Sequence, residues 1–448
     1  FAKTSLNPDV KSNNLEKIKN PAFHKYASIY VDIYDDFINQ VKKSGIEIDP
    51  ESYDDEAKNL IKQIVDKGAV VRNGGNSVHL NAISPACIAC QTGEESITFF
   101  ISLRCHRNCY YCFNPNQEGY DYFLDPKNKR DLIAELDEMK SEGSTISHLA
   151  LTGGEPLLYK EDTVDFFRHA NRLYPKAFSR LYTSGDHIDA AILEELRESE
   201  LDEIRFSIRL HDQEIGIQYT LDRIKLAKKY IPKVMVEMPI VPGELDVMKE
   251  VLRELDEIGI YSINLLEFCY PYYNTGEFNQ KSFTVKKYPY RVLYNYWYAG
   301  GLPISKSEID CLKLIDFAID ENLSLGIHYC SLENKHTGQI YQNHKGQAFQ
   351  ELLYFSKKDY FLKSAKVFGK DIPVVKSKLN KIKGIKFHHS EEHDFLEFQI
   401  HKIKELKGLN VEVGISSNIM ETREDGNYLR ELKVDLCYPD QFDFAMDA

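Results

Sequence analysis

Three closely spaced cysteines could bind one metal cluster between them. Cys105, Cys109 and Cys112 follow the pattern C-x3-C-x2-C in the stretch SLRCHRNCYYCFNPNQ, directly after the apolar run SITFFISL. An iron–sulfur cubane usually takes four protein ligands, so three thiolates would leave one iron open to bind and activate a small molecule. A structural zinc ion and a chance grouping among the nine cysteines are the alternatives. The spacing favours a reactive 4Fe-4S cluster.

A glycine-rich segment follows the next apolar run along the chain. In HLALTGGEPLLY, four residues stand at the end of a predicted strand: Gly153, Gly154, Glu155 and Pro156. Glycine lets the backbone approach a bound group closely. The cysteine triplet after one strand and GGEP after the next resemble the radical S-adenosylmethionine (SAM) superfamily. In that family the open iron chelates the amino and carboxylate groups of SAM, GGEP contacts the amino group, and reductive cleavage yields a 5′-deoxyadenosyl radical.

The elements that would position these motifs follow from a repeated pattern. Short apolar runs at 96–103, 146–154, 178–186, 201–210, 233–243 and 261–268 alternate with amphipathic segments of helical period. Such alternation predicts parallel strands with helices packed outside them. With right-handed crossovers the sheet curls into an incomplete β/α barrel of about six strands. Catalytic groups of such barrels gather where the strands end and the following loops converge.

Further polar residues are expected at these strand ends. Thr183 follows the third predicted strand, Ser207 and Arg209 end the fourth, and Glu237 lies in the fifth. The family resemblance implies that Ser207 binds the SAM ribose and Arg209 its carboxylate, although both could be ordinary hydrogen-bonding residues of a sheet edge. A buried charge such as Glu237 needs a partner, or else the side chain points outward. We predict that all four contribute to SAM binding. The sixth predicted strand ends with Asn264, Glu267 and Cys269.

Two cysteines outside the triplet predict a second metal site. Cys87 and Cys90 form a C-x2-C pair in SPACIACQTG, a spacing that lets both thiolates bind one ion. Because two ligands rarely suffice, we expect Cys269 and Cys330 as the other donors, with Cys437 as the reserve. An all-thiolate site favours iron, zinc or a second cluster, and unpaired thiols are the alternative. We expect Cys311, on an amphipathic helix, to lie in the core.

Composition narrows the class of protein. The 448 residues include 43% hydrophobic and 28% charged residues, as in ordinary globular proteins. The net charge of −13 argues against a nucleic-acid binder. No apolar stretch approaches the ~20 residues that span a bilayer, so no membrane association is expected. Nine cysteines with a cluster motif fit a reducing compartment better than a disulfide framework, and we expect a cytoplasmic protein.

The chain divides into three predicted domains. Residues 1–92 form an N-terminal helical and metal-binding region that ends in the C-x2-C loop. Residues 93–338 form the partial radical SAM barrel, with a tyrosine-rich insertion that carries Trp297 and acts either as a packed cap or as a substrate-contacting lid. From about residue 339 the composition shifts to lysine-rich, strand-like segments, which predict a small C-terminal α+β domain over 339–448.

Several longer stretches resemble one family within the superfamily. They include SPACIACQTG, TFFISLRCHRNCYYCFNPNQ, VMVEMPIVPG, INLLEFCYP, YNYWYAGGLP, HYCSLENKHTGQIYQN and ETREDGNYLREL. Together they resemble the methanogenesis-marker radical SAM family, whose members methylate an arginine side chain of methyl-coenzyme M reductase with the help of cobalamin. The resemblance runs from about residue 80 to the C-terminus.

The resemblance implies a mechanism and further ligands. One SAM methylates a reduced cobalamin, and another is cleaved at the cluster. The adenosyl radical then removes a hydrogen from an unactivated arginine carbon, which takes the methyl group. The family also carries a cysteine-bound metal, and a tyrosine has been considered as an oxygen ligand of the open iron, a role that Tyr120 or Tyr122 could serve. The expected partners are an arginine-containing protein substrate and an electron donor.

One part of the family pattern is missing. Cobalamin proteins that replace the lower axial ligand often carry D-x-H-x-x-G, and no such motif occurs in this sequence. Cobalamin is therefore implied by the resemblance alone, with residues 339–448 as its expected platform. Three alternatives remain open: a cobalamin-independent enzyme that forms crosslinks or thioethers in peptides with an auxiliary cluster, a glycyl-radical activase, and a catalytically silent iron–sulfur sensor or assembly factor.

Overall fold

The computed structural model describes residues 14–294, 301–347 and 349–448, so the predicted role of Trp297 lies outside the described residues. The chain forms two compact units. We call the first the barrel unit; its described residues are 47–289 and 301–338. The second, the antiparallel unit, contains 14–46, 290–294, 339–347 and 349–448. Over these described parts, none of the helices is long and apolar enough to span a membrane.

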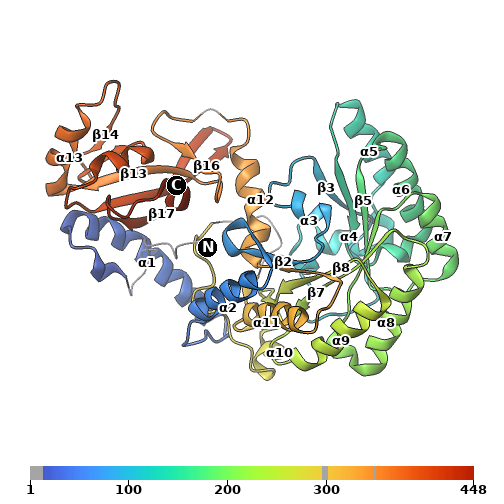
Figure 1. The fold of residues 1–448 in the computed structure, drawn as a ribbon. Coiled ribbons are helices and arrows are strands. Elements are labelled where there is room, and N and C mark those ends of the chain that lie inside the picture. Colours follow the sequence, from blue (N-terminus) through green and yellow to red (C-terminus); the bar gives the residue numbers. More distant parts are fainter. Residues whose placement is uncertain (1–13, 295–300, 348) are drawn as a thin grey trace. The chain divides into compact units, whose positions relative to one another are not determined.

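A single sheet of nine strands forms the centre of the barrel unit, in the order β1-β2-β11-β8-β7-β6-β5-β4-β3 (Figure 1). Every neighbouring pair from β3 through β8 to β11 is parallel, whereas β2 pairs with β11 and β1 in the antiparallel direction. The strands are β1 (Val70–Arg72), β2 (Ser77–Leu80), β3 (Ser96–Phe100), β4 (His148–Thr152), β5 (Phe178–Thr183), β6 (Glu203–Phe206), β7 (Lys233–Ile240), β8 (Ser262–Glu267) and β11 (Gly326–Cys330).

The predicted α/β class with a parallel sheet is confirmed, and the sheet is longer than the expected six strands. The additional parallel strand is β11, which docks on β8 in the register Gly326↔Ser262. Position 326 must be glycine there, because a Cβ atom would lie 2.3 Å from the carbonyl oxygen of Ala82. The hairpin β1–β2 then adds two antiparallel strands. The apolar segment LSLGIHYC indicates a further strand, but its pairing with β8 could not be predicted, because the insertion lies between the two strands.

The two faces of this sheet differ in chemistry. In β7, Val236 and Met238 have one residue between them, and both pack in the core formed with the outer helices. Glu237 lies between them and therefore faces the opposite, concave side, since side chains alternate along a strand. Arg205, Asn264 and His328 occupy equivalent positions in their own strands. The concave face is thus polar, although most of these side chains are buried.

Helices cover the outer face of the sheet, as Figure 1 shows for α5 to α9. The amphipathic α9 is typical: Met248, Val251, Leu252 and Leu255 form its buried stripe, and Gly259 ends it in the left-handed conformation. The helices of this unit are α2 (Asp54–Asp66), α3 (Pro85–Ala89), α4 (Tyr120–Leu124), α5 (Leu132–Ser141), α6 (Lys160–Leu173), α7 (Ala190–Glu198), α8 (Gln213–Ala227), α9 (Leu245–Ile258), α10 (Thr275–Gln280) and α11 (Ser307–Asp320). The short strands β9 (Cys269–Tyr270) and β10 (Leu302–Pro303) pair with each other, and α12 (Leu332–His344) follows β11.

The antiparallel unit contains a second sheet, in the order β14-β15-β13-β16-β17 with β12 beside β13. Its strands are β12 (Tyr354–Phe355), β13 (Leu362–Phe368), β14 (His388–Ser390), β15 (Phe395–Phe398), β16 (Val413–Arg423) and β17 (Gly426–Cys437). The helices α13 (Ile372–Leu379) and α14 (Phe444–Asp447) and the 3-10 helix η8 (Ile400–Leu406) complete this part of the unit. The expected α+β character of the C-terminal region is confirmed.

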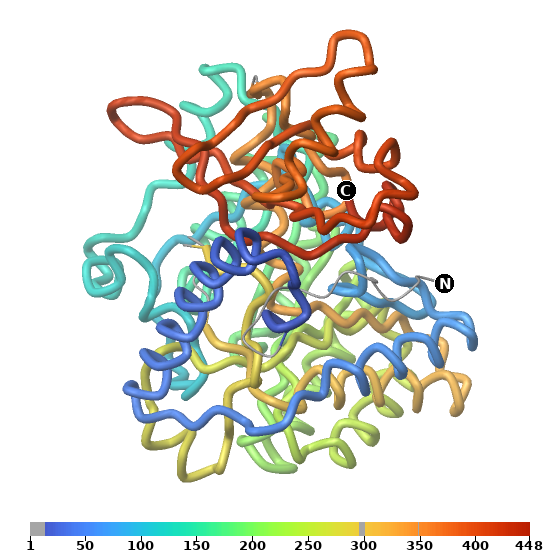
Figure 2. The backbone as a smooth tube through the Cα atoms, turned by 90° about the vertical axis from the view of Figure 1, so that its left-hand side faces the viewer, coloured from blue at the N-terminus to red at the C-terminus, as the bar shows by residue number. Residues whose placement is uncertain are grey.

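The first helix, α1 (Pro21–Lys43), belongs to the antiparallel unit and not to the barrel. Its Phe23 stacks on Phe368 of β13, with 4.5 Å between the ring centroids, and both join one apolar cluster. Figure 2 shows this N-terminal helix beside the strands of the C-terminal sheet. The predicted N-terminal region 1–92 is therefore divided between the units, because the partners of α1 lie far away in the sequence.

Candidate functional site

The predicted cluster cysteines lie on one loop between β3 and α4. Cys105 is exposed, and Cys109 and Cys112 are partly buried. Burial, partly offset by Arg209 and reinforced by the charges of Cys112 and Cys105, raises the pKa of Cys109 to about 11. The three thiols therefore influence one another, and thiolates at these positions need a cation to stabilise them. Throughout the described residues, no three His, Cys, Asp or Glu side chains already stand in metal-binding geometry, so a cluster would draw these thiols together.

The two glycines of GGEP hold the cysteine loop in place. The N–H of Gly154 donates to the carbonyl of Ser102 (3.1 Å), and that of Glu155 donates to the carbonyl of Arg104 (2.9 Å). A Cβ atom on Gly154 would lie 1.9 Å from the carbonyl oxygen of Arg104. Gly153 has a φ of +117°, which an L side chain rarely adopts. The glycines thus bring the backbone close to the cysteine loop, immediately before Cys105.

The carboxylate of Glu155 joins the ends of β4 and β5. It is 1% exposed and accepts hydrogen bonds from Thr183 Oγ1 (2.9 Å), the N–H of Ser184 (2.7 Å) and the N–H of Leu157 (3.0 Å). The structure therefore brings Glu155 and Thr183 together from the ends of two neighbouring strands, with the buried Pro156 directly after Glu155. Partners within the chain satisfy the Glu155 carboxylate, so its observed role is to fix the strand ends.

Arg209 is buried between two aspartates. The side chain is 3% exposed; its Nε donates to Asp212 (2.8 Å) and its Nη1 to the carbonyl of Ser207 (3.2 Å). Its Nη2 lies 3.8 Å from Asp186 Oδ1 and has no hydrogen-bond partner within the described part of the chain. A buried donor without a hydrogen bond is costly, and a carboxylate oxygen within reach would satisfy it. Ser207 is exposed nearby and its hydroxyl donates to the carbonyl of Glu237 (3.3 Å).

A charge network that sequence reasoning missed fixes the cysteine loop from the other side. Asp186 accepts two hydrogen bonds from Arg107 (2.6 and 2.7 Å) and one from His106 (2.5 Å). Burial raises the pKa of Asp186, but the hydrogen bonds from Arg107 and His106 outweigh it and hold that pKa well below its usual range. Arg107 also reaches Asp212 (3.3 Å), which holds Arg209. The only sequence signal was the basic pair inside the C-x3-C spacing.

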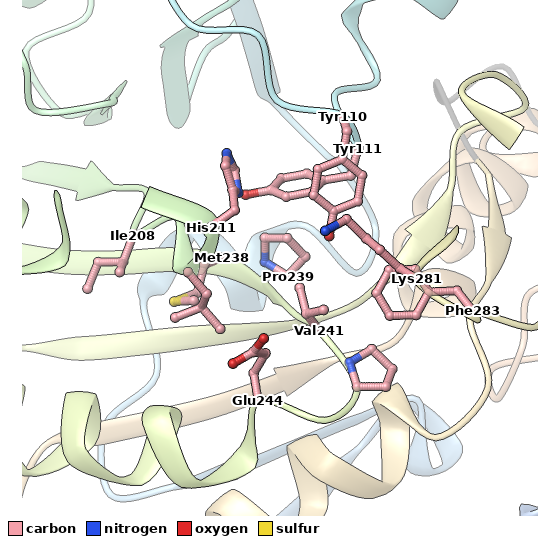
Figure 3. A pocket seen from close by; sticks show the side chains of 12 residues that line it. Tyr110, Tyr111, Ile208, His211, Met238, Pro239, Val241, Glu244, Lys281 and Phe283 are labelled. Atoms are coloured by element: carbon pink, nitrogen blue, oxygen red, sulfur yellow. The ribbon is translucent and has the colours of Figure 1, made fainter. Parts of the chain in front are cut away.

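A cavity of about 300 Å³ opens beside the cysteine loop (Figure 3). Tyr110 and Tyr111, which lie between Cys109 and Cys112, form one wall, and Ile208 and Met238 form part of another. The remaining lining residues are Leu210, His211, Pro239, Val241, Pro242, Glu244, Lys281 and Phe283. Such a volume, with mixed aromatic and polar walls, suits a small organic ligand.

The two candidate tyrosines differ in position. Tyr120 lies near the cysteines, because burial and the charges of Cys112 and Cys105 raise its pKa. Tyr122 is 60% exposed. A third tyrosine, Tyr273, donates from its hydroxyl to the carbonyl of Cys112 and was not expected from the sequence. Tyr120 and Tyr273 therefore lie beside the cluster loop, which itself contains Tyr110 and Tyr111.

Glu237 lies on the concave face and is held there by its own chain. Its carboxylate accepts hydrogen bonds from Arg205 (2.6 Å) and from the Asn264 side chain (2.7 Å). Burial alone raises the pKa of the Glu237 carboxyl. The charge of Arg205 and the hydrogen bond from Asn264 outweigh burial, so the net shift of this pKa is downward. Instead of an open SAM contact, the structure provides an ion pair inside the barrel.

The cysteines predicted for a second metal partly gather on the same face. Cys87 Sγ lies 3.2 Å from the Asn264 amide, which contacts His328, two residues before Cys330 in β11. Burial raises the pKa of Cys330 to about 12, Lys335 lowers it, and Cys90 and Cys87 raise it. Burial raises the pKa of Cys269 to about 12, and the charge of Lys335 lowers it. Lys335 thus acts on both Cys269 and Cys330. Two other cysteines lie elsewhere: Cys311, on the buried face of α11, is in the core as predicted, and Cys437 is buried at the end of β17 in the antiparallel unit.

Comparison with known proteins identifies the class. Residues 99–255 match the family model described as the radical SAM superfamily. A Methanocaldococcus jannaschii protein, whose name describes it as a glycyl-radical enzyme activating enzyme, is 28% identical over 208 residues, which are 44% of this chain and 54% of that relative. The chain thus spans about half the length of the curated relative it matches. On the motif geometry and these matches, the chain belongs to the radical SAM superfamily.

Solved structures with some similarity include SuiB of Streptococcus suis, at 14% identity over 57% of this chain and 54% of that chain, with a TM-score of 0.39. Another is the radical S-adenosylmethionine methyltransferase TsrM of Kitasatospora setae, at 16% identity over 43% of this chain and 40% of that chain, with a TM-score of 0.32. Superfamily membership itself implies a 4Fe-4S cluster and SAM as cofactors.

Proposed function

We propose that this protein is a radical SAM methyltransferase that methylates an unactivated sp3 carbon of an arginine side chain in a protein substrate, with cobalamin as the methyl carrier. The observations that support the SAM part are the pairing of the GGEP backbone with the cysteine loop and the Nη2 of Arg209, which has no hydrogen-bond partner among the described residues. The arginine and cobalamin parts rest on the family resemblance of residues 80–448. The proposed substrate is the alpha subunit of methyl-coenzyme M reductase.

Cys105, Cys109 and Cys112 would hold the cluster. When bound, a 4Fe-4S cluster supplies the electron that cleaves SAM into methionine and a 5′-deoxyadenosyl radical. Within the protein, Arg209 would bind the SAM carboxylate through Nη2, which has no hydrogen-bond partner among the described residues. Asp186 and Asp212 keep that guanidinium and the cysteine loop in a fixed mutual position.

The cavity beside Tyr111 is the proposed place of the adenosine part of SAM. It adjoins the cysteine loop directly, and its Ile208, Met238 and Tyr111 walls would exclude water around a planar base. We further propose that the acidic character of the chain, with a net charge of −13, favours encounter with the cationic arginine segment of the substrate.

The proposed second metal would be held by Cys87, Cys90 and Cys330, with Cys269 as the fourth ligand. The donor set fits iron or zinc, since both bind four thiolates. Burial and the charge of Cys87 raise the pKa of Cys90. The positive charges of Arg180 and Lys335 on the same face act in the opposite direction and lower it. We propose the antiparallel unit as the cobalamin platform, and we assign none of its residues to that cofactor.

The test is a product balance under anaerobic conditions. The protein is reconstituted with iron, sulfide and cobalamin, then given SAM, a strong reductant and an arginine-containing peptide from the reductase. Mass spectrometry should detect S-adenosylhomocysteine, 5′-deoxyadenosine and a peptide heavier by one methyl group. A matched Cys105→Ala variant should lose the 5′-deoxyadenosine. If 5′-deoxyadenosine forms without methylated peptide, with or without cobalamin, the proposal is wrong.

A second candidate is a cobalamin-independent radical SAM enzyme that modifies a peptide by crosslinking. The grouping of Cys87, Cys90 and Cys330 favours it, because an auxiliary cluster could use the same thiols. In the assay above, this candidate predicts 5′-deoxyadenosine together with a peptide that has lost hydrogen and gained no methyl group.

A further inference from the structure

We propose that two asparagines, Asn264 and Asn334, are positioning residues whose side-chain amides donate hydrogen bonds to the sulfurs of Cys87 and Cys330 and hold them as metal-binding thiolates. Asn264 Nδ2 lies 3.2 Å from Cys87 Sγ, and Asn334 Nδ2 lies 3.2 Å from Cys330 Sγ. The inference rests on the second metal site of the proposed function and adds the residues that support it.

Neighbouring groups fix the orientation of the Asn264 amide. Its Oδ1 accepts from His328 Nδ1 (3.0 Å), and the other ring nitrogen of His328 accepts from the Ser77 hydroxyl (2.8 Å). On its other side Asn264 Nδ2 faces the Glu237 carboxylate (2.7 Å), which requires a donor. The amide therefore presents N–H groups to Cys87.

Asn334 is held in a similar way on the first turn of α12. Its Oδ1 accepts from the side chain of Asn73 (2.7 Å), and its backbone N–H donates to Ser331 Oγ (3.0 Å). Asn73 is itself anchored, because it also donates to Thr337 Oγ1 (2.8 Å). With the oxygen engaged by Asn73, the Nδ2 of Asn334 is the atom that faces Cys330.

The charges around the sulfurs agree with an anionic centre. A divalent ion with four thiolates carries a net negative charge. Arg205 Nη2 lies 3.5 Å from Cys87 Sγ, although Arg205 is also paired with Glu203 (2.6 Å) and Glu237 (2.6 Å). Arg180 is 7% exposed, and its Nη1 has no hydrogen-bond partner in the described chain. A buried cation with a free donor and the two amide donors would stabilise the thiolates that a bound metal ion requires.

The amides have a predictable effect on a metal at this site. Groups that orient metal ligands typically change metal affinity about 10–100-fold when they are replaced. A hydrogen bond to a thiolate also lowers the energy of the sulfur lone pairs. Removing it should therefore shift the sulfur-to-metal charge-transfer absorption to longer wavelength. That shift separates a direct hydrogen bond to sulfur from a general effect on folding.

The test uses Co²⁺ as a spectroscopic probe in a Cys105→Ala/Cys109→Ala/Cys112→Ala background, so that the cluster loop does not bind the probe. Full-length protein is titrated anaerobically with Co²⁺ under competition from a chelator. Asn264→Asp, Asn264→Ala and Asn334→Asp are compared with the parent and with Asn427→Asp, the same exchange at an exposed position of β17. Circular dichroism confirms that each variant is folded.

We expect the parent and Asn427→Asp to bind Co²⁺ with thiolate charge-transfer bands. The variants at Asn264 and Asn334 should bind about 10–100-fold more weakly, with bands at longer wavelength. If folded Asn264 and Asn334 variants bind with the affinity and spectrum of the parent, the donor roles are wrong while the metal site stands. If the parent itself binds no Co²⁺, the second metal site is wrong and the donor roles fall with it.

Discussion

The charged residues around the cysteine loop act as a set, and Asp186 is at their centre. It engages both His106 and Arg107, the residues that follow Cys105 directly. Asp186→Asn should lose the ion pair with Arg107, which costs about 1.5–3 kcal/mol per charge-assisted bond. We expect reconstituted protein to contain less than half of the iron that the unmodified chain takes up, measured per chain together with the visible absorbance. The control is Asp121→Asn, an exposed aspartate of α4. Equal iron in both variants would contradict this role.

Arg209 should affect SAM binding and not cluster assembly. Arg209→Lys keeps the positive charge but cannot reproduce the free Nη2 donor. We predict a rise of about 10–100-fold in the SAM concentration needed for half-maximal 5′-deoxyadenosine formation, from the loss of one or two charge-assisted hydrogen bonds. Iron content should stay unchanged. Arg197→Lys, on the exposed face of α7, is the matched exchange. An unchanged SAM dependence would exclude Arg209 as the carboxylate ligand.

The site residues illustrate which features the sequence could reveal. The cysteine triplet and GGEP were found because their spacing is local, and Arg209 because it ends a predicted strand. The contacts of Glu237 could not be predicted, since Arg205 and Asn264 come from β6 and β8 and meet Glu237 only through the strand register. Asp186 was missed because its partners lie across the sheet, on the cysteine loop.

At the scale of elements, the contact between the β4–α6 turn and the cysteine loop is the critical one. Gly154→Ala places a methyl group against the carbonyl of Arg104, where only 1.9 Å is available. The loop must move, and we expect loss of most cluster binding and of SAM cleavage. Gly276→Ala, where a Cβ atom meets nothing within 4 Å, should behave like the unmodified chain. Full iron content in Gly154→Ala would show that the loop tolerates displacement.

The end of α12 carries a buried histidine that makes the stability of the antiparallel unit depend on pH. His344 is 0% exposed; its Nδ1–H donates to the carbonyl of Tyr360 (2.6 Å), and its Nε2 accepts from the N–H of Met420 (3.0 Å). Burial lowers its pKa. The folded ring stays neutral while the unfolded chain takes up a proton below a pH of about 6.5, so stability should fall as the pH falls through that value.

The pH dependence is checked by thermal unfolding of the unmodified chain and of His344→Gln between pH 8 and 5 (about 1.5 units either side of the unfolded pKa). The unmodified chain should lose more stability on acidification than the variant does. Parallel losses in both proteins would show that other groups control the acid sensitivity.

At the scale of the whole molecule, the sequence pattern was sufficient to predict the fold class of each unit. It was insufficient to predict which segments of the chain belong to each unit. Alternating strands and helices predicted the parallel sheet. The assignment of α1 to the antiparallel unit depends on contacts across almost the full chain, such as Tyr26 with Glu431 (2.7 Å). Local periodicity shows that α1 is amphipathic but cannot tell which surface its apolar face covers. The same limit hid the position of the β1–β2 hairpin beside β11.

The contact between α1 and the C-terminal sheet should be important for the stability of the antiparallel unit. Glu431 accepts hydrogen bonds from Tyr26, Tyr30 (2.5 Å) and Ser416 and pairs with the buried Lys366. Glu431→Gln leaves Lys366 without its counter-charge, and we expect a loss of about 3–5 kcal/mol in the free energy of unfolding. Denaturant unfolding measures it, with the exposed Glu424→Gln as the control. A loss below about 1 kcal/mol, the usual range of an exposed ion pair, would contradict the argument.

The central proposal is that this radical SAM protein removes a hydrogen atom from an arginine side-chain carbon, and that the same carbon is then methylated. The most direct measurement uses a reductase peptide whose arginine methylene groups carry deuterium, incubated with reconstituted protein, SAM, cobalamin and reductant. Abstraction from the arginine predicts that deuterium appears in the 5′-deoxyadenosine, in an amount that rises in proportion to the methylated peptide. Unlabelled 5′-deoxyadenosine, formed while the arginine keeps all of its deuterium, would contradict it.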